Sequence, residues 1–343
     1  MRIALDATYS VGSDLTGIGI YSQKLAHALA DSYPEDRFLL CYRPGKLLRA
    51  QRPGSPNARR WILLPPVPIP GAQLFHGLNQ RIDRRPARLV VSTFHDLFVM
   101  TDDYSTAEFR HRFTERAKQA AALSDMVIAV SSFVASQVNS LLGVEHARIR
   151  VVPHGVELPP EGPASGREDI ILFVGTLQKR KNVSRLVAAF ERLPGNWKLV
   201  LVGATGGYGA VEIMSGIEGS PARARIEMTG RLSDPALRRL YSRARIFAFP
   251  SLDEGFGIPA LEAMAHGLPV IASNRSALPE VAGDAAILVD PYSTDEIESA
   301  LRALMNDPSH WDELALRGRA RAAQFPWSRT ATETHEVYRE LLF

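Results

Sequence analysis

Two glutamates, Glu254 and Glu262, are separated by seven residues in the segment DEGFGIPALEAMAHGLPV, residues 253–270. Ionised carboxylates accept hydrogen bonds, so a pair at fixed spacing can hold the hydroxyl groups of a sugar. An acidic loop followed by a short amphipathic helix would explain either glutamate alone. The glycines beside Glu254 favour a ligand site, because a loop rich in glycine lets a ligand approach the backbone.

The residues between the two glutamates predict a helix with a phosphate-binding end. Pro259 suits the first turn of a helix, because the N–H that proline lacks would have no partner there. The pattern predicts a short helix over 260–266 that ends at Gly267. Gly257 and Ile258 then present N–H groups beside the positive end of the helix dipole, which attracts phosphate. Two carboxylates beside such an end predict a sugar-nucleotide site.

A second candidate is the basic loop GTLQKRKN, residues 175–182, which starts at Gly175 after an apolar strand pattern. Asn182 is a candidate cap for the helix that follows. Arg180 and Lys181 would lie at a strand-to-helix corner, where two cations can neutralise the charge on a departing diphosphate. A solvated basic loop is the alternative for this segment alone. The phosphate-binding helix end elsewhere in the chain favours the catalytic interpretation.

Further candidates follow predicted strands. Gly17 and Gly19, in TGIGIY, lie at the expected start of a helix, where the backbone can approach a ligand closely. His95, in TFHDL, and His154, in VPHGVE, could place imidazoles at the same edge of a sheet. A hydrogen-bonded structural role is the alternative for both, and His95 is the stronger candidate. The run GATGGYG, residues 203–209, lacks the spacing of a dinucleotide-binding fingerprint and is interpreted as a flexible loop.

Cysteine and metal chemistry are limited by composition. Cys41 is the single cysteine, which excludes an intramolecular disulfide and a cysteine zinc cage and agrees with a reducing cytoplasm. The sequence contains no Asp-x-Asp pair, and its histidines lack ligand spacing, so we expect a reaction without a metal or other cofactor. The N-terminal residues predict a strand rather than a signal peptide, and we find no transmembrane pattern.

The basic charge is concentrated in the first half of the 343 residues. Residues 1–158 contain 19 Lys and Arg against 14 Asp and Glu, and the remainder contains 21 against 23. Arginines concentrate in 81–88 and 109–118, so this half could meet an anionic acceptor or weakly bind an acidic membrane face. A solvated helix face is the alternative. No stacking pattern accompanies the arginines, so we do not expect nucleic-acid binding.

Two series of strand patterns alternate with helical patterns, which predicts two doubly wound parallel α/β sheets. A linker rich in proline and glycine is predicted at 157–169, and an irregular loop at 63–72. The expected domains are therefore residues 1–158 and 168–325, with residues 326–343 as a terminal helix. Ligands of such sheets bind beyond the carboxyl ends of strands, where the candidate motifs lie. The expected strands are 2–5, 38–41, 89–93, 126–130 and 150–152 in the first half, and 170–174, 198–202, 226–229, 246–249, 270–272 and 286–288 in the second.

Together these motifs resemble the retaining glycosyltransferases of family four. The resemblance covers nearly the whole chain and implies the GT-B fold, with two facing Rossmann-like domains and a C-terminal helix that crosses back to the first domain. The matching motifs are TGIGIY, TFHDL, VIAVS, VPHGVE, VGTLQKRKN, PSLDEGFGIPALEAMAHGLPVIAS and LPEVAGDAAILVDP.

The resemblance implies roles for the charged residues. Glu254 would contact the transferred sugar and Glu262 the ribose of the nucleotide, while Arg180 and Lys181 would bind the diphosphate. Many relatives carry an arginine directly after the glycine of the basic motif, whereas this chain has Thr176. Arg180 is then the expected substitute.

The same resemblance assigns the backbone contacts and one histidine. Gly257 and Ile258 would offer amides to the donor, and Gly19 would lie near the diphosphate. His95 would face the sugar and the acceptor. Gly17 and Gly175 belong to the same donor-binding motifs.

The expected activity is transfer of a hexose from a nucleotide diphosphate to a hydroxyl of a glycan or lipid-linked acceptor. Similarity of the basic motif to bacterial mannosyltransferases of surface-polysaccharide assembly favours GDP-mannose, with UDP-glucose as the alternative donor. Retention of configuration is expected through same-face attack assisted by the departing phosphate. A phosphorylase would need a pyridoxal lysine, and Lys181 is already assigned to phosphate. A non-catalytic nucleotide-sugar-binding subunit of an assembly complex remains the alternative outside enzymes.

Overall fold

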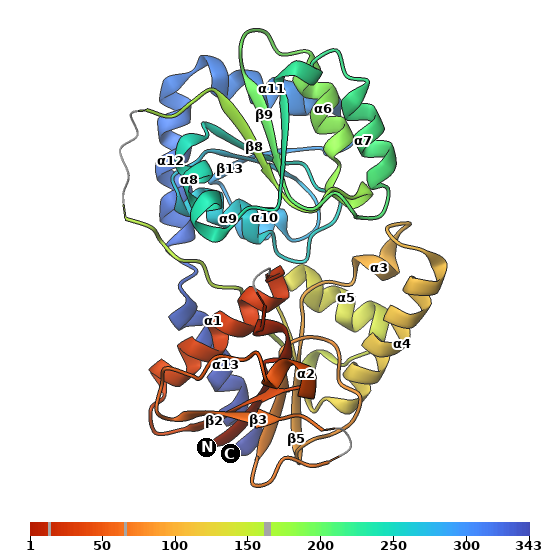
Figure 1. The fold of residues 1–343 in the computed structure, drawn as a ribbon, viewed down its shortest axis with the longest axis vertical. Helices are drawn as coiled ribbons and strands as arrows, with labels where there is room; N and C mark the ends of the chain where they lie inside the picture. The colour runs from red at the N-terminus through yellow and green to blue at the C-terminus, as the bar shows by residue number, and fades with distance from the viewer. Residues whose placement is uncertain (13–14, 65–66, 161–165) are drawn as a thin grey trace. The chain divides into compact units, whose positions relative to one another are not determined.

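The computed structural model describes residues 1–12, 15–64, 67–160 and 166–343. The chain divides into two compact units, each built on one parallel sheet covered by helices (Figure 1). Part of the predicted linker, residues 161–165, lies outside the described residues. The first unit is Met1–Asp102, Ala107–Gly155 and Phe325–Phe343, and the second is Asp103–Thr106 and Val156–Gln324.

The first unit contains seven parallel strands in the order β3-β2-β1-β4-β5-β6-β7. The chain passes from β1 to β2 and β3 on one side and then crosses to β4, so the strand order reverses between β1 and β4. Ligands of open parallel sheets bind beside such a reversal. The strands are β1 (Arg2–Asp6), β2 (Arg37–Tyr42), β3 (Ala58–Ile62), β4 (Leu74–Gly77), β5 (Leu89–Phe94), β6 (Met126–Ala129) and β7 (Ile149–Val151).

Strands β3 and β4 were missing from the sequence prediction, which was wrong to leave residues 58–62 and 74–77 without strands. β3 has two arginines at the sheet edge, one exposed and one half-buried, and β4 is four residues long with a histidine in it. Neither has the apolar period by which strands are recognised. The other five predicted strands of this unit are confirmed, and Cys41 is buried on β2 as expected.

Helix α13 (Trp327–Leu342) packs on the first unit, side by side with α1 (Gly17–Ser32), as the blue and red helices of Figure 1 show. Its buried side chains include Ala331, Val337 and Tyr338. Ala331 and Tyr338 are seven residues apart, and buried His335 lies four residues after Ala331, so these side chains share one helix face and burial follows from the amphipathic pattern. The remaining helices of this unit are α2 (Pro44–Leu47), α3 (Phe98–Thr101), α4 (Ala107–Leu123) and α5 (Ser132–Leu142), with short 3-10 turns at Thr8–Ser10 and His146–Arg148.

A buried chain of hydrogen bonds ties α13 to the sheet and to α1. The hydroxyl of Tyr338 lies 2.6 Å from Nδ1 of His76 on β4, and Nε2 of His76 lies 2.8 Å from the hydroxyl of Thr93 on β5. Thr93 in turn lies 3.2 Å from the hydroxyl of Tyr21 on α1. Burial lowers the pKa of His76 to about 3, so its imidazole is neutral at physiological pH. Each side chain in this hydrogen-bonded chain of four therefore has a partner.

The second unit contains six parallel strands in the order β10-β9-β8-β11-β12-β13. All six predicted strands are confirmed, and the strand order reverses between β8 and β11. The two doubly wound sheets are thus both present. The strands are β8 (Ile170–Val174), β9 (Lys198–Val202), β10 (Ile226–Gly230), β11 (Ile246–Phe249), β12 (Val270–Ser273) and β13 (Ala286–Val289).

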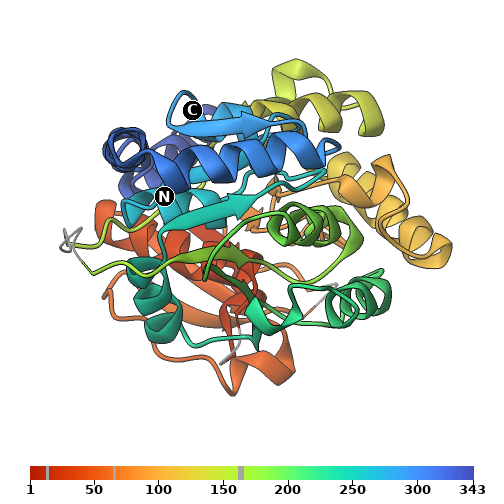
Figure 2. The same ribbon diagram turned by 90° about the horizontal axis from the view of Figure 1, so that it is seen from above.

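Helices of the second unit cover its sheet, and α6 lies beside both α7 and α11, with the α6–α7 pair visible in both views (Figures 1 and 2). Within the described ranges, no helix is both long and apolar enough to cross a membrane. The helices are α6 (Val183–Glu191), α7 (Ala210–Glu218), α8 (Asp234–Arg243), α9 (Ile258–Ala265), α10 (Leu278–Ala282), α11 (Thr294–Asn306) and α12 (Pro308–Ala322), with 3-10 turns at Lys179–Lys181 and Arg223–Arg225.

Replacing Tyr338 by phenylalanine should destabilise the first unit, because Nδ1 of His76 then stays buried without a partner. We expect the free energy of unfolding to fall by about 1–3 kcal/mol, measured by denaturant titration. Tyr33→Phe is the matched control, since its ring stacks on His335 of α13 at 3.5 Å while its hydroxyl has no hydrogen bond among the described residues. Equal stability of the two variants would show that the Tyr338 hydroxyl does not hold α13.

Candidate functional site

The basic loop and Glu254 come together at the strand reversal of the second sheet. Arg180 and Lys181 follow β8, and Glu254 follows the neighbouring strand β11. Because parallel strands present their carboxyl ends at one edge, residues 73 positions apart in sequence meet there.

Glu254 forms a buried ion triad with the two cations. Nη1 of Arg180 lies 3.0 Å from one carboxylate oxygen and Nζ of Lys181 lies 2.5 Å from the other. All three side chains are at most 9% exposed. Lys181 also lies 4.5 Å from the ring centre of Phe249, a cation–π contact. Two cations against one carboxylate leave an excess positive charge in a site shielded from water, where it attracts an anion strongly.

The triad keeps Glu254 ionised. Burial alone raises the pKa of this carboxyl, but the charges of Arg180 and Lys181 outweigh it and hold the pKa at about 2. The interaction therefore stabilises the fold above the ordinary pKa of 4.5 and is lost as the pH falls towards 2. At neutral pH Glu254 can accept hydrogen bonds from hydroxyls but cannot donate a proton.

Two backbone contacts fix this geometry, and neither was predictable from the motif. Arg180 also donates to the carbonyl of Asp253. The backbone N–H of Glu254 donates to the hydroxyl of Ser276 at 3.0 Å, and Ser276 has an unusual positive φ of 56°. Ser276 carries no sequence signal, since its role depends on the path of the loop after β12.

The loop 203–209 braces the basic loop, so its interpretation as a flexible loop was wrong. Three backbone N–H groups of the basic loop, those of Gly175, Leu177 and Lys179, donate to carbonyls of residues 202, 204 and 208, each at 2.8 Å. Glycines suit this segment because its backbone packs directly against the neighbouring loop. The second glycine-rich run therefore positions the cations.

Asn182 is the N-cap residue of α6, as predicted, but its side chain makes no capping hydrogen bond. Its amide donates to the carbonyls of Pro250 and Pro291 at 2.9 and 2.7 Å, and its backbone has a φ of 58°. Asparagine tolerates this left-handed conformation better than most residues. Asn182 thus links the end of the basic loop to the loops after β11 and β13.

Helix α9 begins two residues earlier than predicted, at Ile258, so Pro259 occupies its first turn and Gly257 precedes it. Gly257 has a φ of 102°, and a Cβ there would lie 2.5 Å from a methyl group of Leu278. Only glycine fits this position without strain. The N–H of Ile258 stands at the positive end of α9, as expected for an anion-binding helix end.

Glu262, on α9, is half-buried and separate from the triad. The hydroxyl of Tyr241 donates to its carboxylate at 3.1 Å, and the Tyr241 ring stacks on His266 with centroids 5.2 Å apart. Burial raises the pKa of Glu262 to about 7, against the opposing effect of the Tyr241 hydrogen bond. Arg238 lowers the pKa of Glu262 but does not outweigh burial, whereas Arg180 and Lys181 pair directly with Glu254. A hydroxyl donor such as a ribose would supply a partner for the ionised form.

In the first unit, Gly17 and Gly19 lie at the start of α1, as predicted. The hydroxyl of Thr16 caps this helix by accepting from the N–H of Gly19 at 3.4 Å. A Cβ on Gly19 would lie 2.7 Å from the carbonyl oxygen of Tyr9, so the close packing of α1 on the loop after β1 requires glycine. Gly17 is exposed.

His95 and His154 are brought together and buried against Tyr21. Their rings stack with centroids 5.1 Å apart, and Nδ1 of His95 lies 3.3 Å from Nε2 of His154. Nε2 of His95 lies 2.9 Å from the carbonyl of Leu78, which can only accept, so the proton of neutral His95 resides on Nε2. Burial lowers the pKa of His95 to about 4. Both ring nitrogens of His95 form hydrogen bonds within the first unit. These contacts support a positioning role for His95.

Metal ligands are not evident in the described ranges, where no group of three or more His, Cys, Asp or Glu side chains could hold an ion. Metal independence itself stays a prediction.

Two family models match this chain, one in each half. A family model described as Glycosyltransferase Family 4 matches residues 16–158, and one described as Glycosyl transferases group 1 matches residues 157–323. The chain is 30% identical to O-antigen chain mannosyltransferase B of Escherichia coli, over 98% of this chain and 99% of that protein. It is 34% identical to MMP alpha-(1->4)-mannosyltransferase of Mycolicibacterium hassiacum, over 67% of this chain and 57% of that protein.

Solved structures share the fold at low sequence identity. Sucrose-phosphate synthase from Thermosynechococcus elongatus superposes with a TM-score of 0.78 at 24% identity, over 99% of this chain and 98% of that one. Anabaena HepE, solved in complex with UDP and glucose, has a TM-score of 0.75 at 18% identity, over 99% of both chains.

The raised pKa of Glu262 makes a prediction about stability. The protonated form of Glu262 is favoured in the folded protein. The contribution of Glu262 to the free energy of unfolding is therefore fully present below the ordinary pKa of 4.5 and is lost as the pH rises through about 7. As the pH rises from about 5 to about 8, Glu262→Gln should therefore lose less stability than the wild type. Denaturant midpoints measured across this pH range check the difference. Glu212→Gln, which changes an exposed glutamate on α7, should keep the wild-type slope. A wild-type slope in Glu262→Gln would contradict the assigned burial effect.

Proposed function

This chain belongs to the glycosyltransferases of family four and group 1, and we propose that it transfers mannose from GDP-mannose to a hydroxyl of a glycan or lipid-linked acceptor. Its fold is GT-B, with two Rossmann-like parallel-sheet units. The observation that supports the proposal best is the buried triad of Arg180, Lys181 and Glu254 beside the N-terminal end of α9.

The choice of mannose rests on the relatives. Both mannosyltransferases named above are at least 30% identical to this chain, and one of them is matched over nearly its whole length. UDP-glucose is the alternative donor, favoured by the fold shared with HepE, which has also been solved in complex with UDP-glucose.

In the proposed reaction the bond between the sugar C1 and the diphosphate oxygen breaks, and a bond from C1 to the acceptor oxygen forms on the same face. The acceptor hydroxyl proton passes to the departing diphosphate. Arg180 and Lys181 neutralise the charge that develops on this leaving group in a water-poor site, which is where electrostatic stabilisation is strongest. Glu254, ionised at neutral pH, accepts hydrogen bonds from hydroxyls of the transferred sugar and does not serve as an acid.

We assign the remaining site residues to binding and positioning of the donor. The backbone N–H groups of Gly257 and Ile258 offer donors to phosphate oxygens at the end of α9. Glu262 accepts from the ribose hydroxyls, which favours its ionised form. His95 holds the loop after β5 in place through Leu78 and His154.

The donor is tested by calorimetric titration of the purified protein with GDP, UDP, ADP and dTDP, followed by transfer assays with the corresponding sugar nucleotides. Under the proposal GDP binds most tightly and GDP-mannose alone supports transfer. Glu254→Gln should then lower the transfer rate by at least about a hundredfold, because the charge in contact with the sugar is lost. GDP affinity should be kept, since the two cations lose a competing carboxylate.

Glu262→Gln is the matched comparison for this experiment. It should weaken GDP binding by about tenfold and leave the rate at saturating donor close to that of the wild type, because it removes a charged acceptor from the ribose. Glu254→Ala is a poorer probe, since two buried cations would lose their partner and the fold itself would suffer. Wild-type turnover in both glutamine variants would refute the assignment, and tighter UDP than GDP binding would favour the alternative donor.

Metal independence is tested separately. Because Arg180 and Lys181 carry the charge neutralisation in the proposed reaction, prolonged treatment with EDTA should leave the initial rate unchanged. Loss of activity that is restored by magnesium or manganese would show that the two cations are insufficient.

A further inference from the structure

The first unit contains a pocket between the segment that follows β4 and helix α4. The pocket is lined by Gln80 and Arg81, which follow β4, and by one face of α4: Phe109, Arg112, Phe113 and Arg116. We propose that this pocket binds the acceptor substrate through a phosphate group. In such an acceptor an apolar portion is attached to the phosphate, and a hydroxyl lies next to it. The inference rests on the proposed function, because it assigns the acceptor of the same reaction.

The charge of the pocket selects an anion. Three of its six lining residues are arginines, and none is acidic. Arg112 pairs with Glu108 at 3.2 Å, but both side chains are more than half exposed, so this pair is weak. Arg116 has no acidic partner among the residues that the structure describes. Arg81 uses one nitrogen to donate to the hydroxyl of Tyr9 at 2.8 Å, and a guanidinium has further N–H groups for phosphate oxygens.

A buried amide oxygen in the same pocket calls for a hydroxyl donor. Gln80 is 7% exposed, and its Oε1 is buried without a hydrogen-bond partner. Its Nε2 reaches the carbonyl of Asp96 at 3.5 Å, which leaves the oxygen as the unsatisfied atom. Such a group costs free energy unless a ligand satisfies it. A hydroxyl next to the bound phosphate would do so.

Two aromatic rings supply the apolar part of the pocket. Phe109 is 44% exposed, and its ring lies 6.3 Å from that of Phe113, one turn further along α4. Large apolar side chains exposed beside cations suit a ligand that is itself amphipathic. Carbon chains and the C–H face of a sugar ring both meet this description.

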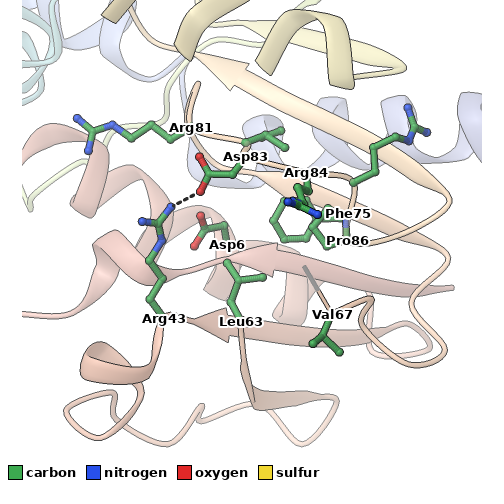
Figure 3. A pocket seen from close by; sticks show the side chains of 11 residues that line it. Asp6, Arg43, Leu63, Val67, Phe75, Arg81, Asp83, Arg84 and Pro86 are labelled. Atoms are coloured by element: carbon green, nitrogen blue, oxygen red, sulfur yellow. Dashed lines mark hydrogen bonds and ion pairs between the residues drawn. The ribbon is translucent and has the colours of Figure 1, made fainter. Parts of the chain in front are cut away.

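A neighbouring pocket shows why the phosphate belongs on the α4 side. It is lined by Asp6, Arg43 and Asp83 among others, and it shares Arg81 with the first pocket. Arg43 is already paired with Asp83 at 3.2 Å, and Figure 3 shows the Arg81 side chain extending away from this pair. This pocket also contains Arg84 and Arg85, but its two carboxylates can accept hydrogen bonds from neutral hydroxyls, whereas the α4 pocket has no carboxylate to oppose a phosphate.

The test measures binding to protein saturated with GDP, so that the donor site is filled. Calorimetric titrations use inorganic phosphate, butyl phosphate, glycerol 1-phosphate and, as the uncharged probe, butanol. We expect both esters to bind more tightly than inorganic phosphate and butanol not to bind. Arg116→Gln should weaken the two esters by about tenfold, since it removes a charged hydrogen-bond donor. Lys118→Gln removes the same charge from α4 outside the pocket and should match the wild type.

A second variant separates ligand binding from a structural role. Gln80→Leu removes the unsatisfied oxygen, so stability should be unchanged or higher, as measured by the denaturant midpoint. Binding of glycerol 1-phosphate, which offers hydroxyls, should weaken about tenfold, whereas butyl phosphate should bind as before. Loss of stability in Gln80→Leu, or equal effects on both esters, would overturn the assignment of Oε1 to the ligand.

Vesicles of phosphatidylglycerol distinguish a specific pocket from a basic membrane surface. Retention on vesicles that falls equally in Arg116→Gln and Lys118→Gln, without binding of either soluble ester, would overturn the proposal in favour of a membrane surface. Ester binding that depends on Arg116 would support it. This readout is independent of turnover, so failure of transfer from GDP-mannose would refute the proposed function and leave the pocket intact.

Discussion

The second unit depends on one electrostatic constraint, the sharing of a single buried carboxylate by two buried cations. Without Glu254, Arg180 and Lys181 would be two uncompensated charges at less than a tenth exposure, which is energetically costly. The carboxylate thus prepares the site before any ligand arrives. The loops after β8 and β11 are held together by this need, while the loop after β9 contacts the first of them through backbone hydrogen bonds. The excess positive charge that remains can attract an anion.

The sequence predicted those parts of the fold whose cause is local. Each strand of the second unit is a buried apolar run, and Gly257 with Pro259 marks the start of α9 within one short segment. The role of Asn182 escaped prediction because its partners, the carbonyls of Pro250 and Pro291, lie 68 and 109 positions away. β4 escaped because His76 is buried only by virtue of Thr93 and Tyr338.

In the candidate site too, the sequence predicted which residues take part but not how they are arranged. Residue types and spacing identified Glu254, Arg180 and Lys181, yet not that they neutralise one another. Spacing alone could not tell that Glu262 lies in a different environment, where burial outweighs the effect of Arg238 and the pKa moves in the opposite direction to that of Glu254. For His95 the decisive fact is that His154 and Leu78 contact its two ring nitrogens, and these residues lie 59 and 17 positions away in the sequence.

The return of α13 to the first unit has a consequence for biosynthesis. The chain leaves that unit after Gly155, builds the second unit, and supplies the last element of the first only from Phe325 onwards. Because a ribosome releases residues in order, the second unit can fold while the first still lacks the partner of His76, which lies 262 positions away in Tyr338. The sheet of the first unit therefore keeps an uncovered surface until α13 has been synthesised, so this unit is completed last. Contacts between residues so distant in sequence also form slowly.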